Sequence, residues 1–189
     1  MIIGITGPGA SGKDTAAEHL EKKGFYHCSL SDIIRDYCRE KNIETTRENL
    51  INAGNELRLK YGRDYLARTA LKKIKEQKNK NAVITSLRHP DEVKVLRENP
   101  DFTLLMLDAP LEIRYERTQQ RKTGRPEDSD SFEQFKKHEE QERIGSGPTQ
   151  QLDLIFQMAD YTVINEGPDG PLLEKVDDFL NKWQKNKKN

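Results

Sequence analysis

A short glycine-rich segment near the start of the chain carries the clearest chemistry. Residues 7–15 read Gly-Pro-Gly-Ala-Ser-Gly-Lys-Asp-Thr, directly after an apolar run and before an amphipathic pattern. In a strand–loop–helix unit with this spacing, successive backbone N–H groups surround phosphate oxygens, and the helix N-terminus adds partial positive charge. Lys13 would lie between the β- and γ-phosphates of a nucleoside triphosphate. A ligand-free turn is the alternative, and the lysine and both flanks argue against it. The predicted contacts are Gly7, Pro8, Gly9, Ala10, Ser11, Gly12, Lys13, Asp14 and Thr15.

The elements that would position this loop alternate between strand and helix. Short apolar runs predict strands over 2–6, 25–29, 82–86, 102–108 and 161–165. Helical patterns lie between and after them, over 13–23, 31–40, 90–98, 110–122, 132–143, 151–158 and 171–185. A longer helical stretch, 46–75, contains Gly54 and Gly62, where we expect breaks, and Ser31 or Asp32 is the expected cap of the helix over 31–40. This alternation predicts an α/β fold, a parallel sheet with helices on both faces.

Several segments at the predicted strand ends carry polar side chains suited to phosphate chemistry. Residues 29–35 read Ser-Leu-Ser-Asp-Ile-Ile-Arg, and residues 85–92 read Thr-Ser-Leu-Arg-His-Pro-Asp-Glu. Residues 112–125 carry repeated arginines, and residues 159–167 read Ala-Asp-Tyr-Thr-Val-Ile-Asn-Glu-Gly. Ligands of open parallel sheets bind outside the carboxyl ends of the strands. A planar guanidinium offers paired donors to a phosphate.

Together these motifs resemble the P-loop nucleoside monophosphate kinases, adenylate kinase and dephospho-coenzyme A kinase among them, and an uncharacterised archaeal-type branch of that superfamily. The resemblance covers roughly residues 1–170. It implies the three-layer P-loop NTPase fold with a five-stranded parallel sheet, a single domain over 1–189, an acceptor-binding insert at about 30–76 and a lid at about 117–149. It also implies ATP as phosphoryl donor and Mg²⁺ as its metal.

On the acceptor side, the resemblance assigns substrate binding to Asp32, Arg35, Arg58 and Arg88. Arg88 corresponds to the arginine that grips the acceptor phosphate, and His89 beside it is an accessory candidate. A solvated helix position for Arg35 and a purely structural role for Arg58 stay open. The acid usually found at position 85 is replaced by Thr85, so metal binding is assigned to Asp14 and Thr15.

On the donor side, the resemblance places the lid arginines Arg117 and Arg121 over the ATP phosphates, and Asn165 in the loop against the adenine. Arg121, with Lys13 and Arg88, completes the predicted catalytic set. Arg117 and Arg121 are four residues apart and share a helix face. A solvated basic helix for Arg121 and a turn role for Asn165 are the alternatives. Arg114 and Lys122 are weaker candidates for the same task.

Composition excludes several other classes. The 189 residues carry 32 basic and 32 acidic side chains, so no net field favours nucleic acid or an anionic membrane. No stretch approaches the roughly 20 apolar residues that span a bilayer, and two cysteines without metal spacing suit a reducing cytoplasm. The prediction is a cytoplasmic kinase, monomeric or homodimeric, whose partner is a small phosphate acceptor, foremost a (deoxy)nucleoside monophosphate. Dephospho-coenzyme A kinase is the second possibility, and an ATPase or assembly factor the third.

Overall fold

A parallel sheet forms the centre of the molecule. The computed structural model describes residues 1–77, 81–120, 131–167 and 169–186. Within them, the five strands are β1 (Ile2–Thr6), β2 (Tyr26–Ser29), β3 (Ala82–Thr85), β4 (Phe102–Asp108) and β5 (Tyr161–Ile164), in the spatial order β2-β3-β1-β4-β5. Every neighbouring pair is parallel, with Ile2 of β1 opposite Ala82 of β3 and Phe102 of β4. The predicted sheet is confirmed.

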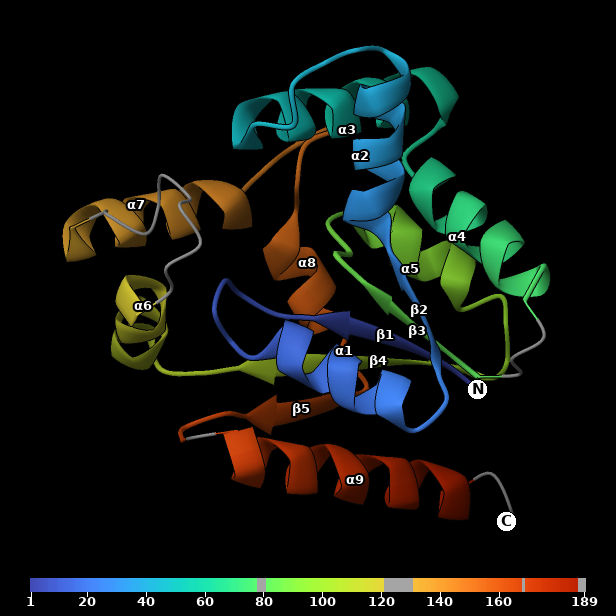
Figure 1. The fold of residues 1–189 in the computed structure, drawn as a ribbon, viewed down its shortest axis with the longest axis vertical. Coiled ribbons are helices and arrows are strands. Elements are labelled where there is room, and N and C mark those ends of the chain that lie inside the picture. The colour runs from blue at the N-terminus through green and yellow to red at the C-terminus, as the bar shows by residue number, and fades with distance from the viewer. Residues whose placement is uncertain (78–80, 121–130, 168, 187–189) are drawn as a thin grey trace.

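Helices cover both faces of this sheet, as Figure 1 shows. One hydrophobic cluster packs alternate strand residues such as Ile84 and Leu104 against α2 (Leu30–Glu40), α4 (Tyr65–Lys75), α5 (Pro90–Leu96) and α8 (Leu152–Gln157). The other packs Ile3, Ile5 and Leu105 against α1 (Lys13–Lys22) and α9 (Asp169–Asn186). Central strands buried on both faces explain the continuous apolar runs of the sequence.

The remaining helices lie beyond the carboxyl ends of the strands. These are α3 (Arg47–Tyr61), α6 (Leu111–Gln120) and α7 (Phe132–Arg143). In Figure 1 the strands run toward α6 and α7, while α3 lies beside α2 above the sheet. Of the lid predicted at about 117–149, residues 121–130 lie outside the described residues.

Two local predictions are wrong. Gly54 does not break a helix, because α3 continues through it, and only Gly62, with φ +101°, separates α3 from α4. The cap of α2 is Ser29 and not Ser31 or Asp32, because the helix begins immediately at the end of β2. Gly54 lies where α3 approaches α2, since a methyl group there would stand 3.1 Å from Ile34 Cδ1. Close helix packing explains why the glycine is tolerated inside the helix.

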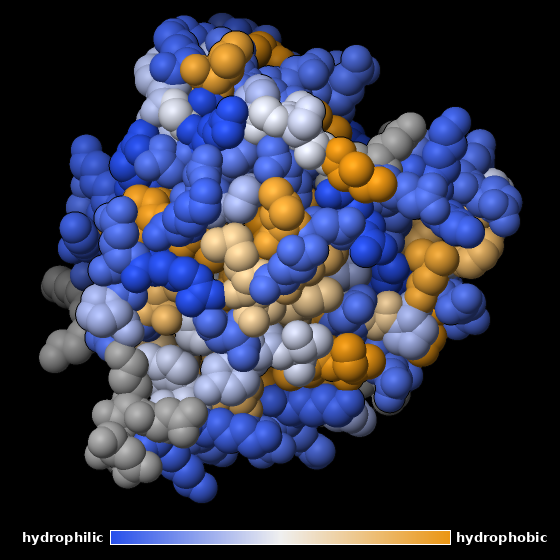
Figure 2. Space-filling view, turned by 180° about the vertical axis from the view of Figure 1, so that it is seen from behind, coloured by the Kyte–Doolittle hydropathy of each residue, from blue (hydrophilic) through white to orange (hydrophobic). Residues whose placement is uncertain are grey.

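The surface is strongly polar. Figure 2 shows a face on which hydrophilic side chains dominate, with hydrophobic ones exposed near its middle and in smaller groups around it. Within the described residues, no helix is long and apolar enough to cross a membrane.

Candidate functional site

The predicted phosphate-binding loop connects β1 with α1 and has a backbone that glycine permits. Gly7 has φ +141°, and a Cβ there would stand 1.9 Å from the Leu107 carbonyl oxygen of β4. Gly12 has φ +100° and is the N-cap of α1. Only glycine adopts such angles freely, so Gly7 and Gly12 permit the backbone shape of this turn. Between them Pro8, Ala10 and Ser11 are buried, while Gly9 is exposed.

Lys13 folds back over this loop. Its ammonium group donates a hydrogen bond to the Pro8 carbonyl oxygen, and the side chain is half-buried. The positive charge is therefore held at the rim of the turn, beside the amino end of α1. A lysine and a helix N-terminus at one place form an anion-binding site.

Asp14 and Thr15 follow in the first turn of α1. Asp14 is exposed, and Thr15 is half-buried. Among the residues that the structure describes, no three His, Cys, Asp or Glu side chains gather as a metal cluster. Mg²⁺ keeps several water ligands and is usually held by one or two protein oxygens together with substrate phosphates. The Asp14 carboxylate and the Thr15 hydroxyl are oxygen groups of that kind, and their binding of Mg²⁺ stays a prediction.

Two residues distant in the sequence converge on the loop from its far side. The Arg117 guanidinium, from α6, donates to the Ala10 carbonyl oxygen at 3.2 Å and to the Gly167 carbonyl oxygen at 2.7 Å. It also donates to the side-chain and main-chain oxygens of Asn165, each at 3.2 Å. Asn165, only 3% exposed, donates in turn to the Ser11 carbonyl oxygen at 3.0 Å. The structure thus brings Arg117 and Asn165 together at the loop.

A second arginine and a carboxylate complete this edge of the site. Arg114 of α6 donates to the Ala109 carbonyl oxygen at 2.9 Å and to the Gly9 carbonyl oxygen at 3.3 Å. It forms an ion pair with Glu139 of α7. A Cβ on Gly9 would lie 3.4 Å from Glu139 Oε1, so this carboxylate reaches the exposed tip of the phosphate-binding loop. Arg114 is only a weaker candidate in the sequence, and Glu139 is not predicted from it.

Hydroxyl groups gather at the ends of β2 and β3. Ser29 Oγ lies 3.2 Å from Ser86 Oγ, and Ser86 has φ +64°, an uncommon angle for a residue with a side chain. Thr85 Oγ1 lies 2.8 Å from His27 Nε2, and His27 Nδ1 lies 3.4 Å from Glu21 Oε2. The position where relatives of this fold were expected to carry an acid therefore holds a buried hydroxyl paired with histidine. Spacing gave no sign of this pair.

The predicted acceptor residues are placed in different ways. Asp32 and Arg35 lie one turn apart on α2 and form an ion pair at 2.7 Å. Arg88 follows β3 and is half-buried. Arg58 is 3% exposed and pairs with the fully buried Glu92, so its side chain is held inside the protein. Arg121 lies outside the described residues.

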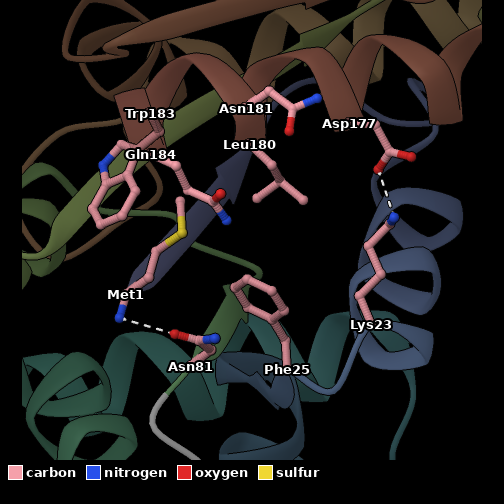
Figure 3. Close-up of a pocket in the computed structure, with 9 residues that line it drawn as sticks. All are labelled: Met1, Lys23, Phe25, Asn81, Asp177, Leu180, Asn181, Trp183 and Gln184. Carbon is pink, nitrogen blue, oxygen red and sulfur yellow. Dashed lines mark hydrogen bonds and ion pairs between the residues drawn. The ribbon is translucent and has the colours of Figure 1, made fainter. Parts of the chain in front are cut away.

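A cavity of about 430 Å³ lies away from these groups. Its lining includes Met1, Phe25 and Asn81, each of which immediately precedes a strand, together with Trp183 of α9. Figure 3 shows α9 along one side and Phe25 pointing inward. The cavity is therefore at the amino ends of the strands, whereas the phosphate-binding loop is at their carboxyl ends.

Comparison with solved structures defines the class of fold. Shikimate kinase from Bacteroides thetaiotaomicron superposes with a TM-score of 0.61 at 16% identity, covering 98% of both chains. The protein TT1252 from Thermus thermophilus gives 0.60 at 17% identity, covering 98% of this chain and 97% of the other. Shikimate kinase from Acinetobacter baumannii, solved with shikimate, gives 0.57 at 19% identity, covering 96% and 93%. The fold is that of the P-loop kinases.

Sequence comparison then places the chain within families. Residues 3–144 match the AAA domain family. A UPF0200 protein of Thermococcus onnurineus is 30% identical over 96% of this chain and 97% of its own length. A UPF0200/UPF0201 protein of Archaeoglobus fulgidus is 33% identical over 98% of this chain, which spans only 56% of that longer protein. The chain therefore belongs to the AAA domain family and to the UPF0200 proteins, which confirms the expected archaeal-type branch.

Proposed function

We propose that the protein transfers the γ-phosphoryl group of ATP to a small phosphorylated acceptor, foremost a (deoxy)nucleoside monophosphate. One observation carries the proposal most. Lys13 closes over a loop that Arg117 and Asn165 hold in place from α6 and from the end of β5. Three cationic or hydrogen-bonding side chains from three separate parts of the chain then contact one turn. The similarity of the fold to that of small-molecule kinases supports the same hypothesis.

The donor side works mainly by positioning and electrostatics. The backbone N–H groups of residues 9–13 and the amino end of α1 would hold the phosphates, and Lys13 would neutralise charge on the transferring group. Mg²⁺, held by Thr15 and Asp14 with water, would supply further charge neutralisation on the phosphate oxygens. An acceptor oxygen attacks the γ-phosphorus, the bond from that phosphorus to the ADP oxygen breaks, and ADP leaves with the bonding electrons.

The acceptor side is proposed at the carboxyl ends of β2 and β3. Arg88 follows β3, and the Ser29 and Ser86 hydroxyls meet beside it. Arg35 stands one turn into α2 and could exchange its surface ion pair with Asp32 for a phosphate. Guanidinium groups favour a dianionic phosphate over a neutral hydroxyl compound, which argues for a phosphorylated acceptor. A cytoplasmic location, as monomer or homodimer, belongs to the same proposal, and the free thiols Cys28 and Cys38 suit it.

Two alternatives each rest on a specific observation. The segment 159–167, with Asn165 at the phosphate-binding loop, favours dephospho-coenzyme A as acceptor. The hydroxyl of Thr85, paired with His27 where an acid was expected, favours an ATPase or assembly factor that transfers little to a small molecule. Water would then be the acceptor.

An acceptor screen separates the three functions. The protein is incubated with Mg²⁺ and γ-labelled ATP, and each of the nucleoside monophosphates, the deoxynucleoside monophosphates and dephospho-coenzyme A is supplied in turn. The proposal predicts label in at least one nucleoside diphosphate. Label in coenzyme A alone would favour the second function, and release of labelled inorganic phosphate with no labelled acceptor would favour the third.

A further inference from the structure

The peptide at Arg88 is held by a buried carboxylate. Glu92, in the first turn of α5, is fully buried, and its Oε2 accepts hydrogen bonds from the backbone N–H groups of Arg88 at 2.8 Å and His89 at 3.0 Å. The second of these closes a capping box in which His89 is the N-cap of α5. A capping box needs only the His89 contact. The additional bond to Arg88 fixes the residue that the function assigns to the acceptor phosphate.

The other oxygen of the same carboxylate connects this peptide to the acceptor insert. Arg58 of α3 donates to Glu92 Oε1 from Nε at 3.0 Å and from Nη2 at 2.9 Å. A Cβ on Gly54 would lie 3.3 Å from Arg58 Nη1, so the glycine leaves room for the guanidinium. Buried ion pairs are often no more stabilising than apolar residues of the same size. A contribution to the stability of the fold is therefore a weak explanation for the presence of the buried Arg58–Glu92 pair.

His89 connects the same peptide to residues 147–151, at the end of the predicted lid. It is 1% exposed, and its Nδ1 accepts a hydrogen bond from the Asp91 N–H at 3.1 Å. Its Nε2 lies 3.0 Å from the Gly147 carbonyl oxygen, which can only accept, so Nε2 carries the proton. Gln151 adds a backbone bond of 2.9 Å to the Arg88 carbonyl oxygen. The neutral imidazole thus joins β3 to residues 147–151.

We propose that Arg58, Glu92 and His89 are positioning residues that set the Arg88 peptide between the acceptor insert and residues 147–151. The proposal rests on the proposed function for the role of Arg88. One hydrogen-bonded unit then places the acceptor phosphate and connects α3 to residues 147–151. Movement of α3 on acceptor binding would be transmitted through Arg58 and Glu92 to Arg88, and through His89 to residues 147–151.

The test compares the same arginine-to-methionine substitution at two arginines whose ion pairs lie at opposite ends of α5. Arg58→Met removes the buried pair, and Arg97→Met removes an ion pair of 2.8 Å with Asp160 that lies apart from Arg88. Arg58→Lys keeps the charge but not the paired donors. With the acceptor found in the screen, Arg58→Met is expected to raise its KM about tenfold and leave the KM for ATP within about twofold. Arg58→Lys is expected to give an acceptor KM between those of the native protein and Arg58→Met. Arg97→Met is expected to change neither the acceptor KM nor the KM for ATP.

Hydrogen exchange tests the same link without any turnover. In Arg58→Met, the amides of 86–92 and of 144–151 are expected to exchange at least about tenfold faster, while those of α1 and the phosphate-binding loop are unchanged. Arg97→Met should leave both segments protected. A raised acceptor KM with unchanged exchange would mean that Arg58 contacts the acceptor itself and would overturn the positioning role. Faster exchange with an unchanged KM would also overturn it. If no acceptor is turned over by the native protein, the proposed function fails, and exchange alone then decides whether the link exists.

Discussion

Asn165 donates a hydrogen bond from its buried side-chain amide to the Ser11 carbonyl oxygen, 3.0 Å away, across 154 positions of sequence. Because the same amide group accepts from Arg117, it connects three elements at the phosphate-binding loop. The loop is thus fixed from β5 as well as from its own strand and helix. The shape of the loop therefore depends on tertiary contacts as well as on its glycines.

Asn165→Ala should weaken ATP binding. The substitution removes the amide that donates to the Ser11 carbonyl oxygen and one of the three oxygens that accept from Arg117 Nη2, and we expect the dissociation constant for ATP to rise about tenfold. Titration calorimetry measures the change. Asn99→Ala is the matched control, because Asn99 also bonds a backbone group, the Asp101 N–H, but far from the loop. Equal ATP affinity in native protein and Asn165→Ala would show that the contact does not shape the site.

Alanine substitutions at Gly12 and Gly24 distinguish the effect of backbone strain on stability from the effect of steric crowding. Both have positive φ, +100° and +89°, but a Cβ at Gly12 would meet Asn165 Nδ2 at 2.5 Å, whereas at Gly24 nothing lies within 4 Å. Gly24→Ala should lower the free energy of unfolding by about 1–2 kcal/mol from strain alone. Gly12→Ala adds a clash and should lower it by about 3 kcal/mol or more, with loss of ATP binding. Urea unfolding of both variants gives the comparison, and equal losses would contradict the described packing at Gly12.

Glu139 places a negative charge where a triphosphate would bind. Its side chain pairs with Arg114 and reaches the Gly9 tip. Glu139→Gln should therefore tighten ATP binding about three- to tenfold, because a repulsive charge is removed and Arg114 is released toward the phosphates. Glu140→Gln, on the same helix but exposed, is the control and should have no effect. Weaker ATP binding in Glu139→Gln would instead assign the carboxylate a supporting role in the nucleotide site.

His89 should make stability depend on pH. Burial, with Arg58 nearby, lowers its pKa below the ordinary 6.5, and this outweighs the raising effect of the Gly147 carbonyl, Asp91 and Glu92. The unfolded chain then binds the proton more readily than the folded one, so stability is full above pH 6.5 and falls as pH drops toward the folded pKa. Thermal unfolding at about pH 7.5 and about pH 5.5 checks this, because His89→Gln should lose less stability on acidification than the native protein. Equal losses would mean that His89 takes up a proton without disturbing the Gly147 contact.

Local signals predicted most of the fold. Apolar runs and their spacing located the strands, and the pattern from Phe102 to Asp108 gave β4 with its observed bounds. The helix bounds were less accurate where tertiary contacts decide them. The sequence predicts a helix break at Gly54. Helix α3 nevertheless continues through this residue, because packing against α2 and Arg58 favours a residue without a side chain. A pattern along one segment carries no information about such a neighbour.

The phosphate-binding loop could be anticipated from spacing, but the contacts around it could not. Glu139 reaches Gly9, and Arg58 reaches Glu92, because separate helices fold over the carboxyl ends of the strands. The resemblance assigned Arg58 to the acceptor and left a structural role open, and the structure places it in a buried pair. Nothing in its local sequence distinguishes these outcomes, since an arginine on an amphipathic helix suits either.

Lys13→Ala is the most direct test of the proposed kinase activity. The native protein and the variant are mixed with γ-labelled ATP, Mg²⁺ and the accepted substrate, and the rate of label transfer is measured after circular dichroism has shown both to be folded. Because charge neutralisation and positioning supply most of the catalysis, the variant should transfer label about a thousandfold more slowly while keeping its fold. Near-native transfer by the folded variant would contradict the assignment of Lys13 and of ATP-dependent phosphoryl transfer to this site.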